Sequence, residues 1–112
     1  MKKFVVIYHA PADAQMESAN MTPEQQAAGM KLWMEWAKQC GDKLVDLGQP
    51  LANGQALTPK GSSASAKQVA GYSVLQAKNM DEAKSLLEGH PHLAWNAACS
   101  IEVHEAMPLP GT

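Results

Sequence analysis

Phe4-Val5-Val6-Ile7-Tyr8, residues 4–8, is the stretch that decides the fold class of this 112-residue chain. Its two alternating sets of side chains are both apolar, and β-branched and aromatic residues predominate. Such a composition is typical of a β-strand that is covered on both faces. The fold must therefore supply a layer on each side of the opening strand.

A helix with an unusually wide apolar surface follows a polar connection over residues 10–21, which we expect to be a long loop. Thr22-Pro23-Glu24-Gln25 combines an N-cap, a proline at the first helical position and a capping box, and Gly41 offers a left-handed stop after Cys40. At 100° per residue, the apolar side chains of this helix cover an arc of roughly 180°. The width predicts that the sheet covers only part of this surface and that another body covers the rest.

The remaining elements complete a ferredoxin-like order. We expect a strand over residues 43–47, a brief return strand at residues 55–59, a flexible turn at residues 60–67 and a strand over residues 69–77. A second helix begins at the N-cap Asn79, and a last strand spans residues 100–106. This order predicts one α+β domain over residues 1–112, with a βαββαβ antiparallel sheet and helices on one face. A second copy of the chain is the simplest cover for the other face, so we expect a homodimer.

Composition and charge limit the classes of molecule that we expect this protein to bind. A net charge of −2, a pI near 6.0 and the lack of any Lys or Arg run argue against nucleic acid. The apolar stretch at the start is too short for a signal peptide, and no segment is long enough to span a membrane, so we expect a cytoplasmic protein with no membrane partner. Cys40 and Cys99 lie far apart without metal-ligand spacing and are expected to be reduced core thiols.

Seven pieces of the sequence together resemble the YCII-related family, including its DGPF branch, over nearly the whole chain. These pieces are residues 3–9, the Thr22-Pro23-Glu24 helix start, residues 44–48, Leu51 with Asn53-Gly54, residues 69–77, residues 80–84, and residues 101–104 with Met107-Pro108. The resemblance implies a dimeric α+β barrel, in which two ferredoxin-like sheets close face to face. It also implies an enzymatic role without an assigned reaction, involving His and Asp residues; Asp13 and Asp46 are the candidates for the Asp. The Asp-Gly-Pro-Phe signature is absent, and residues 60–64 read Lys-Gly-Ser-Ser-Ala instead.

The four histidines are the candidates for acid/base chemistry. His9 ends the first strand on the face of Val5 and Ile7, where an imidazole can act as a general base or can anchor a loop. His90 and His92 flank Pro91, which fixes the local backbone and aims both rings; alternatively, His90 interacts with the helix C-terminus and His92 simply packs. We predict His9 and His92 as catalytic and His90 as substrate-binding. His104 is expected on the polar side of the last strand, in solvent or at a dimer contact.

The tryptophans are the candidates for a binding pocket. Core or interface packing is the usual role of tryptophan. Trp33, Tyr72 and Trp95 are nevertheless predicted to wall an apolar pocket for a small organic molecule, with His9 or His92 at its rim. Three functions stay open: a small-molecule enzyme without cofactor or metal, a non-catalytic module that binds a small ligand, and a structural or interaction domain. The first is the preferred interpretation.

Overall fold

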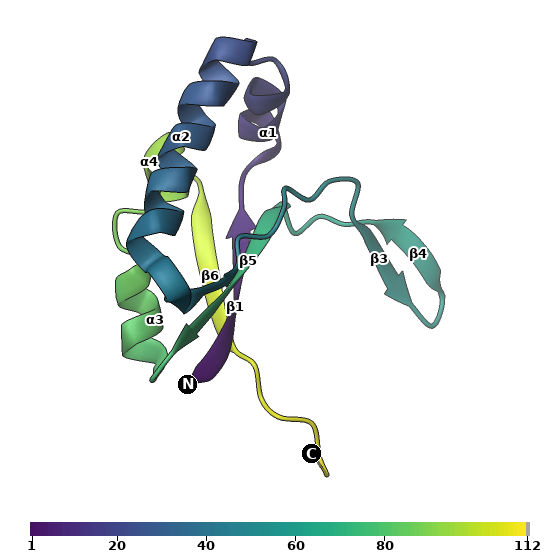
Figure 1. The fold of residues 1–112 in the computed structure, drawn as a ribbon. Coiled ribbons are helices and arrows are strands. Elements are labelled where there is room, and N and C mark those ends of the chain that lie inside the picture. The colour runs from purple at the N-terminus through teal and green to yellow at the C-terminus, as the bar shows by residue number, and fades with distance from the viewer. Residues whose placement is uncertain (112) are drawn as a thin grey trace.

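The structure is a computed structural model and describes residues 1–111. It is an α+β fold with one main antiparallel sheet and one separate hairpin (Figure 1). The strands are β1 (Lys2–His9), β2 (Leu44–Asp46), β3 (Gln55–Thr58), β4 (Gly61–Ala64), β5 (Val69–Ala77) and β6 (Ser100–Glu105). The helices are α1 (Ala12–Ala19), α2 (Pro23–Cys40), the short 3-10 turn η1 (Gly41–Lys43), α3 (Met80–Leu86) and α4 (Pro91–Trp95).

The main sheet has the order β2-β5-β1-β6, so the opening strand lies in its interior between β5 and β6. Both pairings of β1 are antiparallel, with Val6 opposite Ser73 of β5 and opposite Val103 of β6. The helices α2, α3 and α4 cover one face of this sheet, and no element of residues 1–111 covers the other (Figure 1). We call this uncovered surface the open face.

The core lies between the sheet and the helices. Phe4, Val6 and Tyr8 of β1 are buried there beside Leu75 of β5 and Trp36 of α2. Val5, Ile7 and His9 point to the open face and are only half-buried. Side chains alternate along β6, because Ile101 and Val103 pack against the core while Glu102 and His104 are exposed, and His104 thus lies on the polar side of the strand as predicted.

Both predicted helix starts are confirmed. The side chain of Thr22 accepts a hydrogen bond from the backbone of Gln25, whose side chain returns one to Thr22. Asn79 caps α3 by accepting from the backbone N–H of Glu82. The wide apolar surface of α2 is only partly used, since Trp36 and Cys40 are buried while other apolar side chains remain more than half exposed, namely Met30, Leu32 and Met34.

Two predictions about connections are wrong, and one further helix was not predicted. Residues 10–21 contain the helix α1, in which Ala14 is buried and Gln15 ties the helix to the carbonyl of Ala10. Residues 60–67 are not only a turn, because β4 pairs with β3 in a hairpin that is separate from the main sheet. The residues after α3 form the further helix α4, and its N-cap is His90.

A glycine fixes the close approach of the β2 connection to β5. Gly48 has φ +80°, and a Cβ at this position would collide with the carbonyl oxygen of Tyr72. Gly48 also donates its N–H to the side chain of Asp46, and Tyr72 donates to the carbonyl of Gln49. This contact fixes where the chain leaves β2 to enter the β3–β4 hairpin. Cys40 and Cys99 are free buried thiols, as predicted.

Candidate functional site

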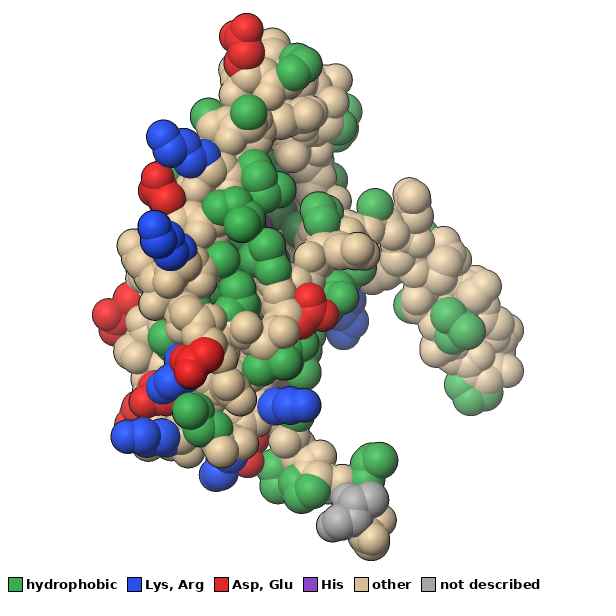
Figure 2. Space-filling view, in the orientation of Figure 1, with side chains coloured by type: hydrophobic (Ala, Val, Ile, Leu, Met, Phe, Trp, Pro, Cys, Tyr) green, Lys and Arg blue, Asp and Glu red, His purple; other side chains and the backbone are tan. Residues whose placement is uncertain are grey.

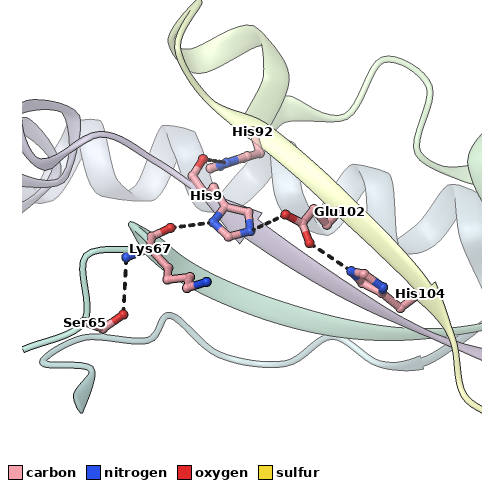
Figure 3. A network of polar contacts seen from close by, with 6 residues as sticks. All are labelled: His9, Ser65, Lys67, His92, Glu102 and His104. Carbon is pink, nitrogen blue, oxygen red and sulfur yellow. Dashed lines mark hydrogen bonds and ion pairs between the residues drawn. The ribbon is translucent and has the colours of Figure 1, made fainter. Parts of the chain in front are cut away.

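His9 lies at the end of β1 on the open face, and one of its ring nitrogens is fixed by a backbone carbonyl (Figure 3). Nδ1 is 2.8 Å from the carbonyl oxygen of Lys67, and because a carbonyl only accepts, Nδ1 carries a proton. In neutral His9 the lone pair is therefore on Nε2. That atom is buried and makes no hydrogen bond with any of residues 1–111. It is the ring nitrogen of His9 that can accept a proton.

A carboxylate stands next to this lone pair. Oε2 of Glu102 on β6 lies 3.3 Å from Nε2 of His9, and its other oxygen accepts from Nε2 of His104 at 2.9 Å (Figure 3). The hydrogen bond from His104 is the main cause that lowers the pKa of Glu102 below its usual range. Glu102 is therefore ionised at neutral pH, so a protonated His9 would have a counter-ion in place.

His92 lies on the other face of the sheet. Its Nε2 donates to the backbone carbonyl of His9 at 2.8 Å, so the two predicted catalytic residues meet through the backbone of His9 and not through their rings. Burial of His92 is the main cause that lowers its pKa. His92 thus fixes the position of His9 from behind.

His90 begins a directional chain of buried hydrogen bonds. Its Nδ1 accepts from the backbone N–H of His92 at 2.9 Å, so neutral His90 carries its proton on Nε2, which lies 3.3 Å from the hydroxyl of Tyr8. The Tyr8 hydroxyl is 2.8 Å from Oγ of Ser73, and Ser73 donates to the carbonyl of Leu47 at 2.6 Å. In this series each side chain donates a hydrogen bond to the next group. The N–H of His90 and the hydroxyl protons of Tyr8 and Ser73 are therefore all used in hydrogen bonds.

Burial favours the neutral forms of His90 and Tyr8 in this series of hydrogen bonds. Desolvation, with a smaller contribution from His92, lowers the pKa of His90 to about 4. Desolvation likewise raises the pKa of Tyr8 to about 12, against the opposing effect of its hydrogen bond to Ser73. Trp33 and Trp36 stack edge-on against His90, with ring centroids 4.5 and 4.3 Å away. These contacts are typical of a packed aromatic core.

The YCII-related domain matches residues 1–106 of the chain. This chain belongs to the YCII-related family. Among solved structures it is similar to the 5-chloro-2-hydroxyhydroquinone dehydrochlorinase TftG from Burkholderia phenoliruptrix AC1100, in complex with 2,5-dihydroxybenzoquinone. The identity is 20%, the match covers 89% of this chain and 90% of that one, and the TM-score is 0.48, so it carries no argument about the site. No curated protein matches.

This YCII-related protein does not assemble the predicted residues into one pocket. Trp33, His90, His92 and Trp95 lie on the helix-covered face, where His92 contacts Trp95 at a centroid distance of 6.0 Å. Tyr72 points to the open face, as does His9. A pocket walled jointly by Trp33, Tyr72 and Trp95 is therefore wrong for the single chain. The catalytic and binding roles of these residues stay predictions.

Two surface hollows of the YCII-related chain lie away from these residues. One, of about 540 Å³, is bounded by α1 and the start of α2, and the other, of about 350 Å³, by α3, α4 and β6. Within residues 1–111, no three His, Cys, Asp or Glu side chains are arranged to hold a metal ion. The same residues include no helix that is both long and apolar enough to cross a membrane.

The sequence pattern does not predict the two groups that contact the ring of His9. Glu102 was recognisable only as a member of the polar side of its strand, and Lys67 acts through its backbone, which no side-chain pattern reveals. Ser73 and Tyr8 alternate inward on their strands in the expected way. Their pairing across the sheet requires the strand register, which brings Ser73 opposite Val6 and Gly71 opposite Tyr8.

Proposed function

We propose that this YCII-related protein is a homodimeric small-molecule enzyme in which His9 acts as a general base. Two copies would meet through their open faces and close a dimeric α+β barrel, with His9 and Glu102 inside. The observation that carries the proposal is the unpaired, buried Nε2 of His9 beside Glu102. The substrate class is a small organic molecule with an acidic C–H or O–H bond.

The composition of the open face supports a second copy as its cover. Val5, Ile7, Tyr72 and Val74 form an apolar strip across β1 and β5 and are only half-buried in the single chain. A sheet face of this kind normally packs against another layer. In a twofold dimer the same strip serves both copies.

The charges of the open face are suited to self-association. Lys3 lies near the start of β1 on this face, whereas Glu102 lies beside Ile7, near the other end of the strand. A face-to-face pair with opposed strands would bring the Lys3 end of each copy over the Glu102 end of the other. Opposite charges would then meet twice about the twofold axis.

The hydrogen-bonding state of the two ring nitrogens of His9 supports the role of a base. Its Nδ1–H is engaged by Lys67, so the Nε2 lone pair and the carboxylate of Glu102 are two acceptors that face each other at 3.3 Å. A proton taken from the substrate onto Nε2 satisfies both groups, and the substrate keeps the electron pair of the broken bond as a carbanion or oxyanion. Returning this proton completes the cycle. His92 is a positioning residue, since it holds the His9 backbone.

The test is hydrogen–deuterium exchange on small acidic molecules. The protein is incubated in D₂O with a panel of enolisable ketones and hydroxylated aromatic acids, and the loss of proton NMR signal at the acidic carbon is followed. The informative variant is His9→Asn, because its amide N–H can still donate to Lys67 while it offers no base. We expect a loss of at least about 100-fold in the exchange rate. His104→Asn is the matched control and should reduce the rate by less than about tenfold, since it only weakens the hold on Glu102.

The outcomes separate the candidate functions. Exchange that is catalysed equally by the wild type and His9→Asn would contradict the base role. Stabilisation of the protein by a panel compound without any exchange would instead assign a binding module. Neither exchange nor stabilisation across the panel would leave the interaction domain as the better description.

A further inference from the structure

The β3–β4 hairpin is the part of the molecule that its own fold leaves unexplained. We call residues 52–64, which contain β3 and β4, the arm. The arm projects from the main body on the side away from α2 and α3 (Figure 1). Every one of its residues is exposed, and Leu57 is 78% exposed. A two-stranded hairpin without a packing partner is at best marginally stable, so the arm needs a surface to pack against.

The composition of the arm indicates a contact and not a solvated loop. Lys60 at its turn is its one charged residue, and the visible face of the arm shows no charged side chain (Figure 2). Natural proteins usually protect exposed strand edges with charges, prolines in the strand or bulges. Here β3 and β4 pair in regular register from Gln55–Ala64 to Thr58–Gly61 and carry small polar or apolar side chains.

The root of the arm is held firmly, which argues against a freely moving loop. Asn53 lies at the start of the arm and Gln68 shortly after its end, and they are the non-glycine residues with positive φ in the described part of the chain. Asn adopts this conformation readily in turns, whereas Gln rarely does unless its surroundings impose it. Around Gln68 the imposing contacts are visible, because its carbonyl accepts from Ala10 and the carbonyl of Lys67 accepts from His9. The geometry of the root thus aims the arm.

The structure points to a second copy of this chain as the occupant: we propose that each arm clasps the partner that sits on the open face. The inference rests on the dimer proposed above. Figure 1 shows the arm on the side of the main sheet opposite α2 and α3. The half-buried apolar strip lies on that same open face, so one partner can contact both. Each copy also carries both the arm and the face, so a twofold pair would use every contact twice. His9 would then connect the proposed site to the dimer contact, since it binds the root of the arm.

The first test removes the arm without disturbing the body. Gly54 and Ser65 already face each other, with Ser65 N–H donating to the carbonyl of Gly54 at 2.9 Å. Replacing residues 55–64 by Asn-Gly closes the chain there with a two-residue turn. Sedimentation equilibrium should show a dimer dissociation constant raised at least about a hundredfold over the full chain. Circular dichroism reports whether the shortened chain is folded.

The second test keeps the arm and changes one side chain. Leu57→Ser should raise the dissociation constant of the dimer about a hundredfold. The substitution is present in both copies, so it removes two buried leucine contacts, each of which changes the constant roughly tenfold. Leu32→Ser is the matched control, since Leu32 is 55% exposed on α2, in the helix layer. It should change the constant by less than about threefold. If the shortened chain does not fold, the comparison of Leu57→Ser with Leu32→Ser still tests whether the arm contacts the partner.

A cross-link tests where the arm docks. Leu57→Cys labelled with a benzophenone should give, on illumination, interchain links to peptides of β2 or β6, the edge strands of the partner's sheet that stay accessible when the two open faces meet. Links confined to one chain, or links to α2, would overturn the proposed docking. A dimer whose dissociation constant is unchanged in both arm variants would overturn it as well while leaving the dimer itself standing. A monomeric full chain would instead remove the dimer proposal and the arm proposal together.

Discussion

Lowering the pH from 7 to 4.5 should destabilise the protein, and the buried ring of His90 should account for a large part of the loss. This ring is fully buried, and its pKa is lowered from 6.5 to about 4, mainly by desolvation. Between these two values the unfolded chain takes up a proton that the folded chain refuses. Because the unfolded state binds more protons, stability is present above pH 6.5 and is lost as the pH falls toward 4.

The size of the effect follows from the separation of the two pKa values. About 2.5 pH units correspond to roughly 3 kcal/mol in total, of which about 2 kcal/mol is lost by pH 4.5. The matched variant is His90→Asn, whose side-chain oxygen can still cap α4 by accepting from His92. It loses the packing of the ring against Trp33 and Trp36, so its stability at pH 7 should fall by about 2–4 kcal/mol. Its pH dependence should be flatter by about 2 kcal/mol.

Urea unfolding followed by tryptophan fluorescence measures both quantities at one fixed protein concentration. His92, Glu82 and Glu102 also have lowered pKa values and weaken the fold in acid. They are present in both proteins, so their contribution cancels in the difference apart from the charge interaction between His90 and His92. Parallel stability curves for the wild type and His90→Asn would refute the reasoning. A His90 ring that titrates near pH 6.5 in the folded protein, followed by NMR, would refute it equally.

Three further predictions follow from single contacts. Gly48→Ala should destabilise the fold by at least about 2 kcal/mol in thermal or urea unfolding, because the added methyl group collides with the carbonyl of Tyr72, and Gly29→Ala, which meets open space, should not destabilise it. Ser73→Ala should cost about 1–3 kcal/mol, because the buried Tyr8 hydroxyl loses its acceptor, and a smaller loss in Tyr8→Phe would separate the unpaired hydroxyl from the packing of the ring. Lys3→Glu should weaken the dimer in sedimentation equilibrium, and the double variant Lys3→Glu with Glu102→Lys should restore it; failure of this rescue would argue against opposed strands across the dimer.

The sequence predicts the framework of this fold well, because its signals are local. The doubly apolar residues 4–8, the capping box at Thr22 and the Asn79 cap each depend on neighbouring residues, and the structure confirms the strand and both helix starts. The cover on the second face of this strand stays a prediction. The α1 helix has only a weak apolar stripe and its N-cap is Pro11, which offers no side-chain acceptor, so residues 10–21 resemble a loop. Residues 61–64 become a strand only because β3 lies beside them.

The site is predicted less completely because it depends on strand register. His9 was identified from its position at the end of an apolar strand, but its contact with Glu102 requires Ile7 to stand opposite Glu102, and no local pattern fixes this pairing. The predicted pocket failed for a related reason. Tyr72 lies between the inward-facing Gly71 and Ser73 and therefore points to the opposite face from Trp33. The resemblance to the YCII-related family named the fold without supplying these contacts.

The central claim is that the open face of the sheet closes against a second copy around His9. Light scattering at micromolar concentration tests this most directly, on the wild type and on Val74→Glu, which introduces a charge into the apolar strip. The account predicts about 24 kDa for the wild type, twice the chain mass of 12.0 kDa, and about 12 kDa for a folded Val74→Glu variant. A wild type that is monomeric at this concentration, or a Val74→Glu variant that remains dimeric, would contradict it.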